Sequence, residues 1–320
     1  MLPNQVQRTL VERALVATGD HVLVACSGGP DSTVLLHVLH RIRRDVGITL
    51  CAAAIDHGLR VESAEEVEGV RALANALGVP FATKRIHVPK DGASVQGRAR
   101  ALRYEALREL AAEVRATRIA VGHTLDDQAE TVIARLLRGS GIRGLRGIEP
   151  RREDGVVRPL IDCRRSEVLA YAAASDLSFV LDPSNQATAF ERVRIRKEIL
   201  PALVREDPRV AEHLAALADE AMAVEVILDE AVPALPENGT LEVDAATLRA
   251  LSPPLRTRWL RRWLARETGV TPGRVHLDQV GRLLTGAGEV LLGSGWAVRR
   301  GGGRLYLEYR EHRPTRTHRS

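Results

Sequence analysis

Residues 27–32, Ser-Gly-Gly-Pro-Asp-Ser, have the composition of an anion-binding loop. The loop follows an apolar run at 22–26, which predicts a buried parallel strand, and precedes an apolar pattern at helical spacing. A glycine-rich turn at a helix start presents backbone N–H groups and the positive end of the helix dipole, so phosphate is its natural ligand. Asp31 adds a carboxylate that suits Mg²⁺ bridging phosphate oxygens. The loop has no lysine, which excludes the G-x-x-x-x-G-K-[ST] loop.

A second cluster combines one histidine with three acids, His123, Asp126, Asp127 and Glu130. Asp127 and Glu130 are three residues apart, so on a helix their carboxylates share one face. Capping of the helix explains one of these acids but not the whole set. Two functions stay open, a metal site or a cradle for a cationic substrate. With one histidine and no cysteine nearby, Mg²⁺ or an ammonium group fits the cluster better than zinc does.

The elements that must position these residues alternate between strands and helices. Strands are predicted at 22–26, 48–55, 80–88 and 118–121, and helices at 5–17, after the loop, at 62–77, at 94–115 and up to 137. This alternation predicts an α/β fold, a Rossmann-like parallel sheet with helices on both faces. The polar clusters at 27–33, 56–60 and 123–130 each follow a strand, so we expect them at one edge of the sheet. Asp56 and His57 are there the candidate contacts for the adenosine part of a nucleotide.

The remainder of the chain predicts a second, smaller domain. An alanine-rich helix at 208–231 leads into a turn-rich stretch at 233–239. Helices at 244–250, 254–267 and 275–284 precede two or three strands, with Gly301–Gly303 as a hairpin turn. We therefore predict a catalytic domain at 1–207, a connecting helix and linker at 208–240, and a mostly helical α+β domain at 241–320.

Positive charge is concentrated at the end of the chain. The net charge is +5, but residues 251–320 hold 14 Arg against 5 Asp or Glu, about +9. The arginines on the helix at 254–267, Arg258, Arg261 and Arg262 among them, have the character of an RNA footprint, whereas Trp259 and Trp263 suit the core. Arg192, Arg194 and Arg196 alternate with apolar residues. They predict either a solvated helix face or a helix that contacts phosphates.

The cysteines and the hydropathy of the chain argue against several classes of protein. The three cysteines, Cys26, Cys51 and Cys163, contain no C-x-x-C pair, which argues against a disulfide framework, a zinc site or an iron–sulfur cluster. Cys26 and Cys51 suit small core positions. No run of 18 apolar residues and no signal-peptide pattern occur, so we expect a cytoplasmic protein without a membrane partner. The sequence leaves the oligomeric state open, a homodimer included.

Seven motifs resemble the tRNA(Ile)-lysidine synthetase family of N-type ATP pyrophosphatases, which is also called the PP-loop superfamily. They occur in the family's order at Ser27–Ser32, Asp56–Arg60, Ala99–Tyr104, Gly122–Thr131, Arg138–Gly141, Arg158–Leu160 and Asp182–Asn185. The loop alone indicates only the superfamily, whereas the ordered set is specific. It covers residues 22 to about 200, and the remainder matches more loosely.

The resemblance implies an ATP- and Mg²⁺-dependent ligase. ATP would adenylate the C2 oxygen of the wobble cytidine in tRNA(Ile) with a CAU anticodon. The amine of L-lysine would then displace AMP and give lysidine, which pairs with A rather than G. By motif position, the ATP-binding residues would be Ser27, Gly28, Gly29, Pro30, Asp31, Ser32, Asp56 and His57.

The resemblance also implies the remaining roles. Asp31 would hold Mg²⁺, and Asp127 and Glu130 would hold lysine. Arg100 or Arg103 would meet the reacting nucleotides. The arginines that would face the tRNA are Arg192, Arg194 and Arg196. Carboxylates suit an ammonium group and guanidinium groups suit the charge on a leaving phosphate, so the chemistry agrees with this assignment.

Two other functions remain as alternatives. One is another PP-loop enzyme, a tRNA thiolase or an amidating ATP pyrophosphatase. Such thiolases generally need paired cysteines, and glutamine-dependent amidation needs an amidotransferase domain; neither is visible in the sequence. The other is a non-catalytic RNA-binding protein with a vestigial nucleotide site. The presence of Asp31, Asp127 and Glu130 argues against such decay.

Overall fold

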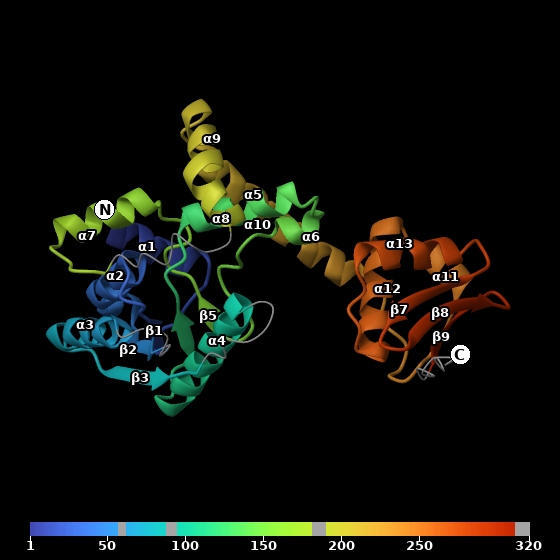
Figure 1. Ribbon diagram of the computed structural model, residues 1–320, viewed down its shortest axis with the longest axis horizontal. Coiled ribbons are helices and arrows are strands. Elements are labelled where there is room, and N and C mark those ends of the chain that lie inside the picture. Colours follow the sequence, from blue (N-terminus) through green and yellow to red (C-terminus); the bar gives the residue numbers. More distant parts are fainter. Residues whose placement is uncertain (57–61, 88–94, 181–189, 311–320) are drawn as a thin grey trace, which may run out of the picture. The chain divides into compact units, whose positions relative to one another are not determined.

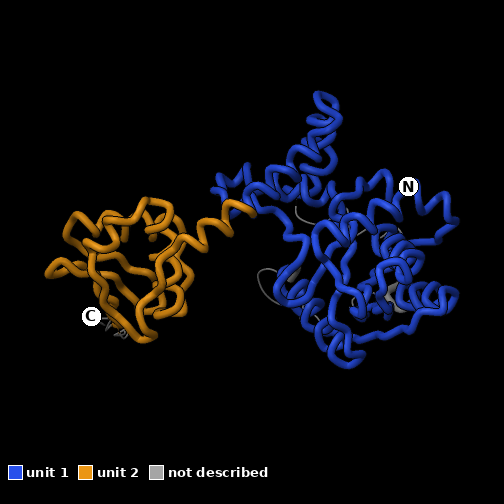
Figure 2. Tube along the Cα trace, turned by 180° about the vertical axis from the view of Figure 1, so that it is seen from behind, with its two compact units in different colours: residues 1–222 blue, residues 223–320 orange. Residues whose placement is uncertain are grey.

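The computed structural model describes residues 1–56, 62–87, 95–180 and 190–310. The chain forms two compact units, residues 1–222 and 223–320 (Figure 2). Their boundary lies within helix α10 (Val210–Ala231), the helix predicted at 208–231. No helix among the described residues is long and apolar enough to cross a membrane.

Unit 1 is built on a parallel sheet of five strands in the order β3-β2-β1-β4-β5 (Figure 1). The strands are β1 (His21–Ala25), β2 (Thr49–Asp56), β3 (Phe81–Arg85), β4 (Arg118–Ala120) and β5 (Val156–Val157). The chain runs outward in one direction from β1 through β2 to β3, and in the other from β4 to β5. The loops after β1 and β4 therefore meet at the switch point, where open α/β sheets bind ligands.

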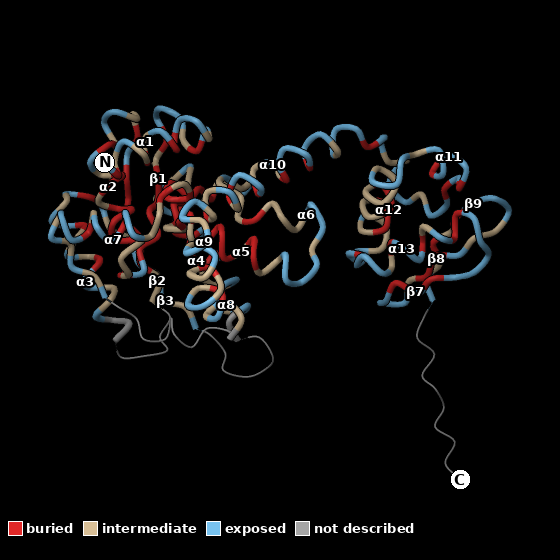
Figure 3. The backbone as a smooth tube through the Cα atoms, turned by 90° about the horizontal axis from the view of Figure 1, so that it is seen from above, coloured by how far each residue is buried: buried red, intermediate tan, exposed pale blue. Residues whose placement is uncertain are grey.

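Alternate side chains of β1 enter two separate cores, one on each face of the sheet. Figure 3, which colours the backbone by burial, draws nearly all of β1 as buried. Val22 and Val24 pack with the four helices of one face, and Leu23 and Ala25 pack with α4 on the other. These helices are α1 (Leu2–Glu12), α2 (Pro30–Val46), α3 (Glu62–Ala76) and α7 (Arg165–Ala174) on the first face, and α4 (Val95–Glu113) on the second. This confirms the predicted parallel sheet with helices on both faces.

A further cluster of helices extends from β4 and carries half of the predicted site. Leu125 and Ile133 of α5 pack against Ile195 and Leu200. The elements involved are α5 (Leu125–Leu137), α6 (Ile142–Leu145), α8 (Phe190–Arg194), a π-helix (Ile195–Ile199) and α9 (Leu200–Glu206). Packing of α5 against α8 and the π-helix places the segment at 190–199 beside the predicted carboxylate cluster.

Unit 2 is a mostly helical α+β domain, as predicted. Its antiparallel sheet has the order β6-β9-β8-β7. The elements are β6 (Glu242–Asp244), α11 (Ala245–Ala250), α12 (Pro253–Thr268), α13 (Arg274–Leu283), β7 (Glu289–Gly293), β8 (Trp296–Gly301) and β9 (Arg304–Tyr309). Trp259 and Trp263 are buried in its core, which confirms their predicted role. Gly302 and Gly303 form the β8–β9 turn with positive φ angles of 55° and 81°.

Some boundaries of helices and strands that we predicted from the sequence of unit 1 were wrong. Helix α1 ends at Glu12 rather than at 17, because Ala14 turns into the left-handed region with φ 47° and Leu15 N–H bonds back to Leu10. The two-residue strand β5 was not predicted. Its residues are fully buried at the sheet edge, but a strand of two residues leaves no periodic pattern.

Candidate active site

The loop at 27–32 is closed by hydrogen bonds among its own residues. Ser27 N–H donates to Ser32 Oγ at 3.1 Å, and Ser32 Oγ donates to the Gly29 carbonyl at 3.0 Å. Gly28 has a φ of 79°, which favours glycine, and its carbonyl accepts from Val180 N–H at 2.9 Å. Gly29 is the N-cap of α2. The loop is thus held in one shape before any anion arrives, at the positive end of a long helix.

Gly122 allows the loop after β4 to lie directly against the start of α2. A Cβ atom at this position would lie 3.1 Å from the Asp31 carbonyl carbon, 3.2 Å from its oxygen and 3.2 Å from Ser32 N. All three are backbone atoms, so no side-chain rotation relieves the contact. The glycine therefore fixes how closely the carboxylate cluster approaches the anion loop.

Replacing Gly122 with alanine is expected to lower the free energy of unfolding by about 1–3 kcal/mol, the usual cost of overpacking. It should also weaken ATP binding, since the start of α2 must shift. Thermal unfolding and ATP titration measure both effects. Gly69→Ala is the matched control: its Cβ meets nothing within 4 Å, so it should raise stability. Equal effects of the two substitutions would contradict the close approach at Gly122.

Asp31 has one satisfied and one unsatisfied carboxylate oxygen. Its Oδ2 lies 3.3 Å from Arg165 Nη2. Its buried Oδ1 finds no hydrogen-bond partner within the part of the chain that the structure describes. Burial raises the pKa of Asp31 to about 6, against the opposing effect of Arg165. A carboxylate oxygen left without a donor beside an anion loop fits a Mg²⁺ ion that takes its other ligands from phosphate and water. Within the described residues, no group of three or more His, Cys, Asp or Glu is placed to hold a metal by itself.

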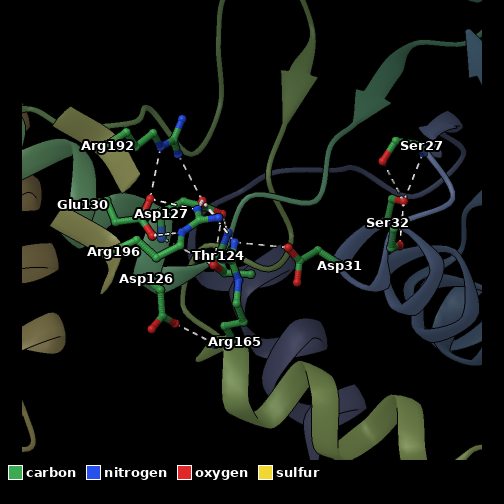
Figure 4. Close-up of polar contacts among 11 residues, drawn as sticks. Ser27, Asp31, Ser32, Thr124, Asp126, Asp127, Glu130, Arg165, Arg192 and Arg196 are labelled. Carbon is green, nitrogen blue, oxygen red and sulfur yellow. Dashed lines mark hydrogen bonds and ion pairs between the residues drawn. The ribbon is translucent and has the colours of Figure 1, made fainter. Parts of the chain in front are cut away.

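Asp127 serves both the helix and the site (Figure 4). Its Oδ2 accepts from Thr124 N–H at 2.9 Å, and Thr124 Oγ1 accepts from Asp127 N–H, which forms a capping box at the start of α5. Its Oδ1 faces the cluster. Burial opposes ionisation of Asp127, but the Arg165 guanidinium, with smaller effects of the Thr124 hydrogen bond and Arg192, holds its pKa below the ordinary value. One acid of the set is thus a cap, as the sequence indicated, and it also contributes to the site.

Three arginines surround the buried pair Asp127 and Glu130 (Figure 4). Asp127 Oδ1 lies 3.3 Å from Arg165 Nη2, 3.1 Å from Arg192 Nη2 and 3.2 Å from Arg196 Nη2. Glu130, whose side chain is only 1% exposed, pairs with Arg192 at 3.1 Å and with Arg196 at 2.6 Å. Burial opposes the charge of Arg196, but its hydrogen bond to Glu130 raises its pKa above the ordinary value. The cluster is a balanced network of charges rather than a bare acidic cradle.

His123 and Arg158 lie at the edge of this network. Burial lowers the pKa of His123 to about 3, so its ring is neutral near pH 7. A neutral ring can accept, and Arg158 Nε donates to His123 Nδ1 at 3.2 Å. Arg158 is itself buried, and burial lowers its pKa. His123 therefore orients an arginine here and adds no charge of its own.

Arg100 and Arg103 lie on successive turns of α4, with different exposure. Arg100 is exposed, and its guanidinium lies 5.2 Å from the centre of the Tyr104 ring. Burial, with a smaller effect of Arg100, lowers the pKa of Arg103. Among the described residues Arg103 has no ion-pair partner. A half-buried guanidinium without a carboxylate is suited to receive a phosphate group.

The other residues expected at the site have varied surroundings. Asp56 ends β2, next to β1, and lies 3.4 Å from Arg85 Nε. His57 lies outside the described residues. Arg192 and Arg194 are exposed and Arg196 is half-buried, and the carboxylates described above are the partners of Arg192 and Arg196. In unit 2, Arg258 pairs with Glu225 and Asp229, and Arg262 also pairs with Asp229. The expected role of these arginines and of Arg261 in RNA binding remains a prediction.

Arg165 was not identified from the sequence, although it links the two halves of the site. The same nitrogen, Nη2, lies 3.3 Å from Asp31 Oδ2 and 3.3 Å from Asp127 Oδ1. Its backbone N–H donates to Asp126 Oδ2 at 2.6 Å. Arg165 is the first residue of α7, where the helix dipole disfavours a cation. A basic residue at a helix start was the one available signal.

Each of the two units contains a segment that matches a known family of protein domains. Residues 2–203 match the PP-loop domain, and residues 244–306 match the TilS substrate-binding domain. The chain is 38% identical over 316 residues to the tRNA(Ile)-lysidine synthase of Salinispora arenicola, covering 93% of this chain and 94% of that protein. It is 38% identical over 206 residues to the enzyme of Clostridioides difficile, of which it spans only 45%.

A comparison of structures agrees with the fold. The U34-tRNA thiolase NcsA from Methanococcus maripaludis matches 69% of this chain and 78% of its own, with a TM-score of 0.60 and 18% identity. At this identity the match shows a shared fold alone. The chain spans about half the length of several curated relatives and nearly the whole length of others. On its two matched domains and this near-complete alignment, the chain belongs to the tRNA(Ile)-lysidine synthase family.

Proposed function

We propose that this protein ligates L-lysine to C2 of the wobble cytidine of tRNA(Ile) with a CAU anticodon, converting ATP to AMP and pyrophosphate. The observation that carries the proposal is the bridge by Arg165 between Asp31 of the anion loop and Asp127 of the carboxylate cluster. This bridge brings the residues that we propose for phosphate and those that we propose for a cationic substrate side by side. A reaction that activates one substrate with ATP and then attacks it with an amine needs this arrangement.

In the first step the cytidine C2 oxygen attacks the α-phosphorus of ATP and pyrophosphate leaves. The loop at 27–32, at the start of α2, would bind the phosphates, with Asp56 and His57 near the adenosine. Asp31 would hold Mg²⁺, which when bound offsets negative charge on the phosphate oxygens. Arg103, which is half-buried and has no ion-pair partner among the described residues, would meet the phosphate group that transfers. Arg100 on the exposed side of α4 would meet the tRNA.

In the second step the lysine amine attacks C2, the C–O bond to AMP breaks, and the amine nitrogen loses its proton. Asp127 and Glu130 would hold an ammonium group of lysine. Asp127 is an ionised acceptor, because Arg165 lowers its pKa against the effect of burial, and Glu130 adds a second carboxylate beside it. The substrates, ATP, tRNA and free lysine, are those of a cytoplasmic enzyme.

The properties of the cysteines disfavour the thiolase alternative. All three cysteines of the chain are buried and unpaired. Burial raises the pKa of Cys26 and of Cys163 to about 12, so neither thiol ionises readily near pH 7. Thiol chemistry on a tRNA base requires an accessible thiolate or a metal-bound one. The fold shared with a tRNA thiolase therefore extends to the ATP-binding frame and not to a sulfur-transfer site.

One assay separates the functions. The protein is incubated with ATP, labelled lysine and tRNA(Ile) carrying the CAU anticodon, and label in the RNA is measured together with AMP release. Lysine-dependent labelling supports the ligase. AMP release with sulfide but not with lysine would support a thiolase, and tRNA binding without AMP release would support an RNA-binding protein.

Replacing Arg258, Arg261 and Arg262 with alanine is expected to weaken tRNA binding about equally for different tRNAs. Each lost phosphate contact should reduce the log–log salt dependence by about 0.7–0.9. ATP and lysine binding should not change, since unit 1 alone would hold them. Filter binding at several salt concentrations measures the slope.

The ion pairs of Arg258 call for a stability control. Because its side chain is only 13% exposed and pairs with two carboxylates, its loss should destabilise unit 2, so the variant must be shown to be folded by thermal unfolding. An unchanged affinity and slope in the folded variant would exclude these arginines as the footprint.

A further inference from the structure

The site proposed for the amine of lysine is already filled by the chain's own cations. Figure 4 shows Arg192 and Arg196 directed at Glu130 and Asp127 from the segment at 190–199. Each of the two arginines contacts both carboxylates. An ammonium group that binds these carboxylates must therefore share them with the arginines or replace one of them.

The two arginines are not held equally. Arg196 makes three hydrogen bonds, of 2.6, 2.9 and 3.2 Å, and its side chain is 37% exposed. Arg192 makes two, both of 3.1 Å, and its side chain is 47% exposed. Longer bonds in a more hydrated position are weaker, and holding a long side chain in one rotamer also costs entropy. Arg192 is the one that leaves at least cost.

Departure of Arg192 leaves two acceptors and not two isolated charges. Glu130 Oε2 keeps its 2.9 Å bond to Arg196 Nη2, and Asp127 Oδ1 keeps its contacts to Arg196 and Arg165. The oxygens that Arg192 releases are those that its Nε and Nη2 had bridged. A single ammonium group, with three donors, can bridge the same two oxygens.

We propose that Arg192 is an exchangeable occupant of the amine site, and that an ammonium group of the substrate binds by replacing its guanidinium on Glu130 and Asp127. The proposal rests on the proposed function, because lysine is taken as the entering amine. Arg192 then sets the affinity for lysine. The apparent affinity equals the affinity of the free site multiplied by the fraction of molecules in which Arg192 has left the carboxylates. When lysine is absent, Arg192 also supplies a cation to two buried carboxylates, which avoids the cost of an uncompensated buried charge.

The test is a calorimetric titration of lysine into the full chain without ATP or tRNA. Arg192→Gln is expected to bind lysine about three- to tenfold more tightly than the parent, because a neutral side chain competes poorly for the carboxylates. Arg192→Lys keeps an internal cation and should stay close to the parent. Arg194→Gln is the matched control, since it removes the same charge from an exposed position on the same helix, and it should not change the affinity.

The outcomes distinguish the exchange from the function on which it rests. Tighter binding confined to Arg192→Gln supports the exchange, and so would binding by that variant when the parent shows none. Equal or weaker binding by a folded Arg192→Gln would overturn the exchange while leaving the lysine site in place. Absence of lysine binding in every variant would overturn both. Thermal unfolding of each variant shows that it is folded.

Discussion

Asp31→Asn is expected to abolish ATP-dependent pyrophosphate release while making the folded protein more stable near pH 7. Burial raises the pKa of Asp31 from 3.8 to about 6. Between about pH 4 and 6 the folded state keeps a proton that the unfolded chain releases, so the free energy of unfolding falls as pH rises through this window. Above it the charged carboxylate costs on the order of 3 kcal/mol, which asparagine avoids. The same substitution removes the ligand proposed for Mg²⁺.

Pyrophosphate release and thermal unfolding at pH 5 and 7.5 measure both effects. Asp154→Asn is a control of opposite sign, because hydrogen bonds and charges of Arg108 and Arg152 outweigh burial and lower the pKa of Asp154. Its carboxylate stabilises the fold above its unfolded pKa, so neutralising it should reduce stability near pH 7 and spare catalysis. Activity retained by Asp31→Asn would refute the metal role of Asp31, and reduced stability would refute the effect of burial.

Glu130→Gln and Asp127→Asn should each raise the KM for lysine far more than the KM for ATP. An uncharged amide forgoes a charge-assisted hydrogen bond to an ammonium group, which is worth on the order of 1.5–3 kcal/mol, or about 10- to 100-fold in affinity. Steady-state labelling of tRNA at varied lysine and varied ATP gives the two constants. Losses of equal size for the two substrates would indicate instead a metal site shared by both.

Glu191→Gln is the matched control for these carboxylates. Glu191 lies on α8 next to Arg192, but its partner is the exposed Arg138 rather than the cluster. Its neutralisation should change neither KM. Glu130→Gln should also lower stability, because two guanidinium groups lose a carboxylate partner whose side chain is 1% exposed. Asp127→Asn keeps an oxygen that can still accept from Thr124 N–H, but three guanidinium groups lose a charged partner, so a comparable loss of stability is expected there.

The parts of unit 1 that were predictable from sequence are those whose pattern is local. The apolar run at 22–26, the loop at 27–32 and the helix after it depend on neighbours in the chain, and the structure has all three. Strand β5 is too short to show a pattern. Helix α7 lacks a clear apolar stripe, since only Val168 and Ala172 of its ten residues are buried. Such a helix is recognisable only from its place in the fold.

The residues of the candidate site likewise divide into those that the sequence identified by local spacing and those that it missed. The loop and the acids at 126–130 were found because their spacing alone has chemical meaning. Arg165 was missed because its role depends on contacts with residues 134 and 38 positions away in the chain. The charge pattern around Arg192 and Arg196 predicted a solvated face or a phosphate-binding one, and neither includes the ion pairs that the structure has. Alternating charge shows that a face is polar but not which partner it meets.

The capping box of α5 has a consequence for local unfolding. Thr124 is fully buried, and its N–H donates to Asp127 Oδ2. The other oxygen of this carboxylate, Oδ1, faces the arginines. Fraying of the first turn of α5 would therefore break the contacts between Asp127 and the arginines at the same time as it exposes the Thr124 amide. A ligand held by Asp127 must slow hydrogen exchange at Thr124, although it never touches that residue. The protection of one backbone amide thus measures how firmly the substrate is held.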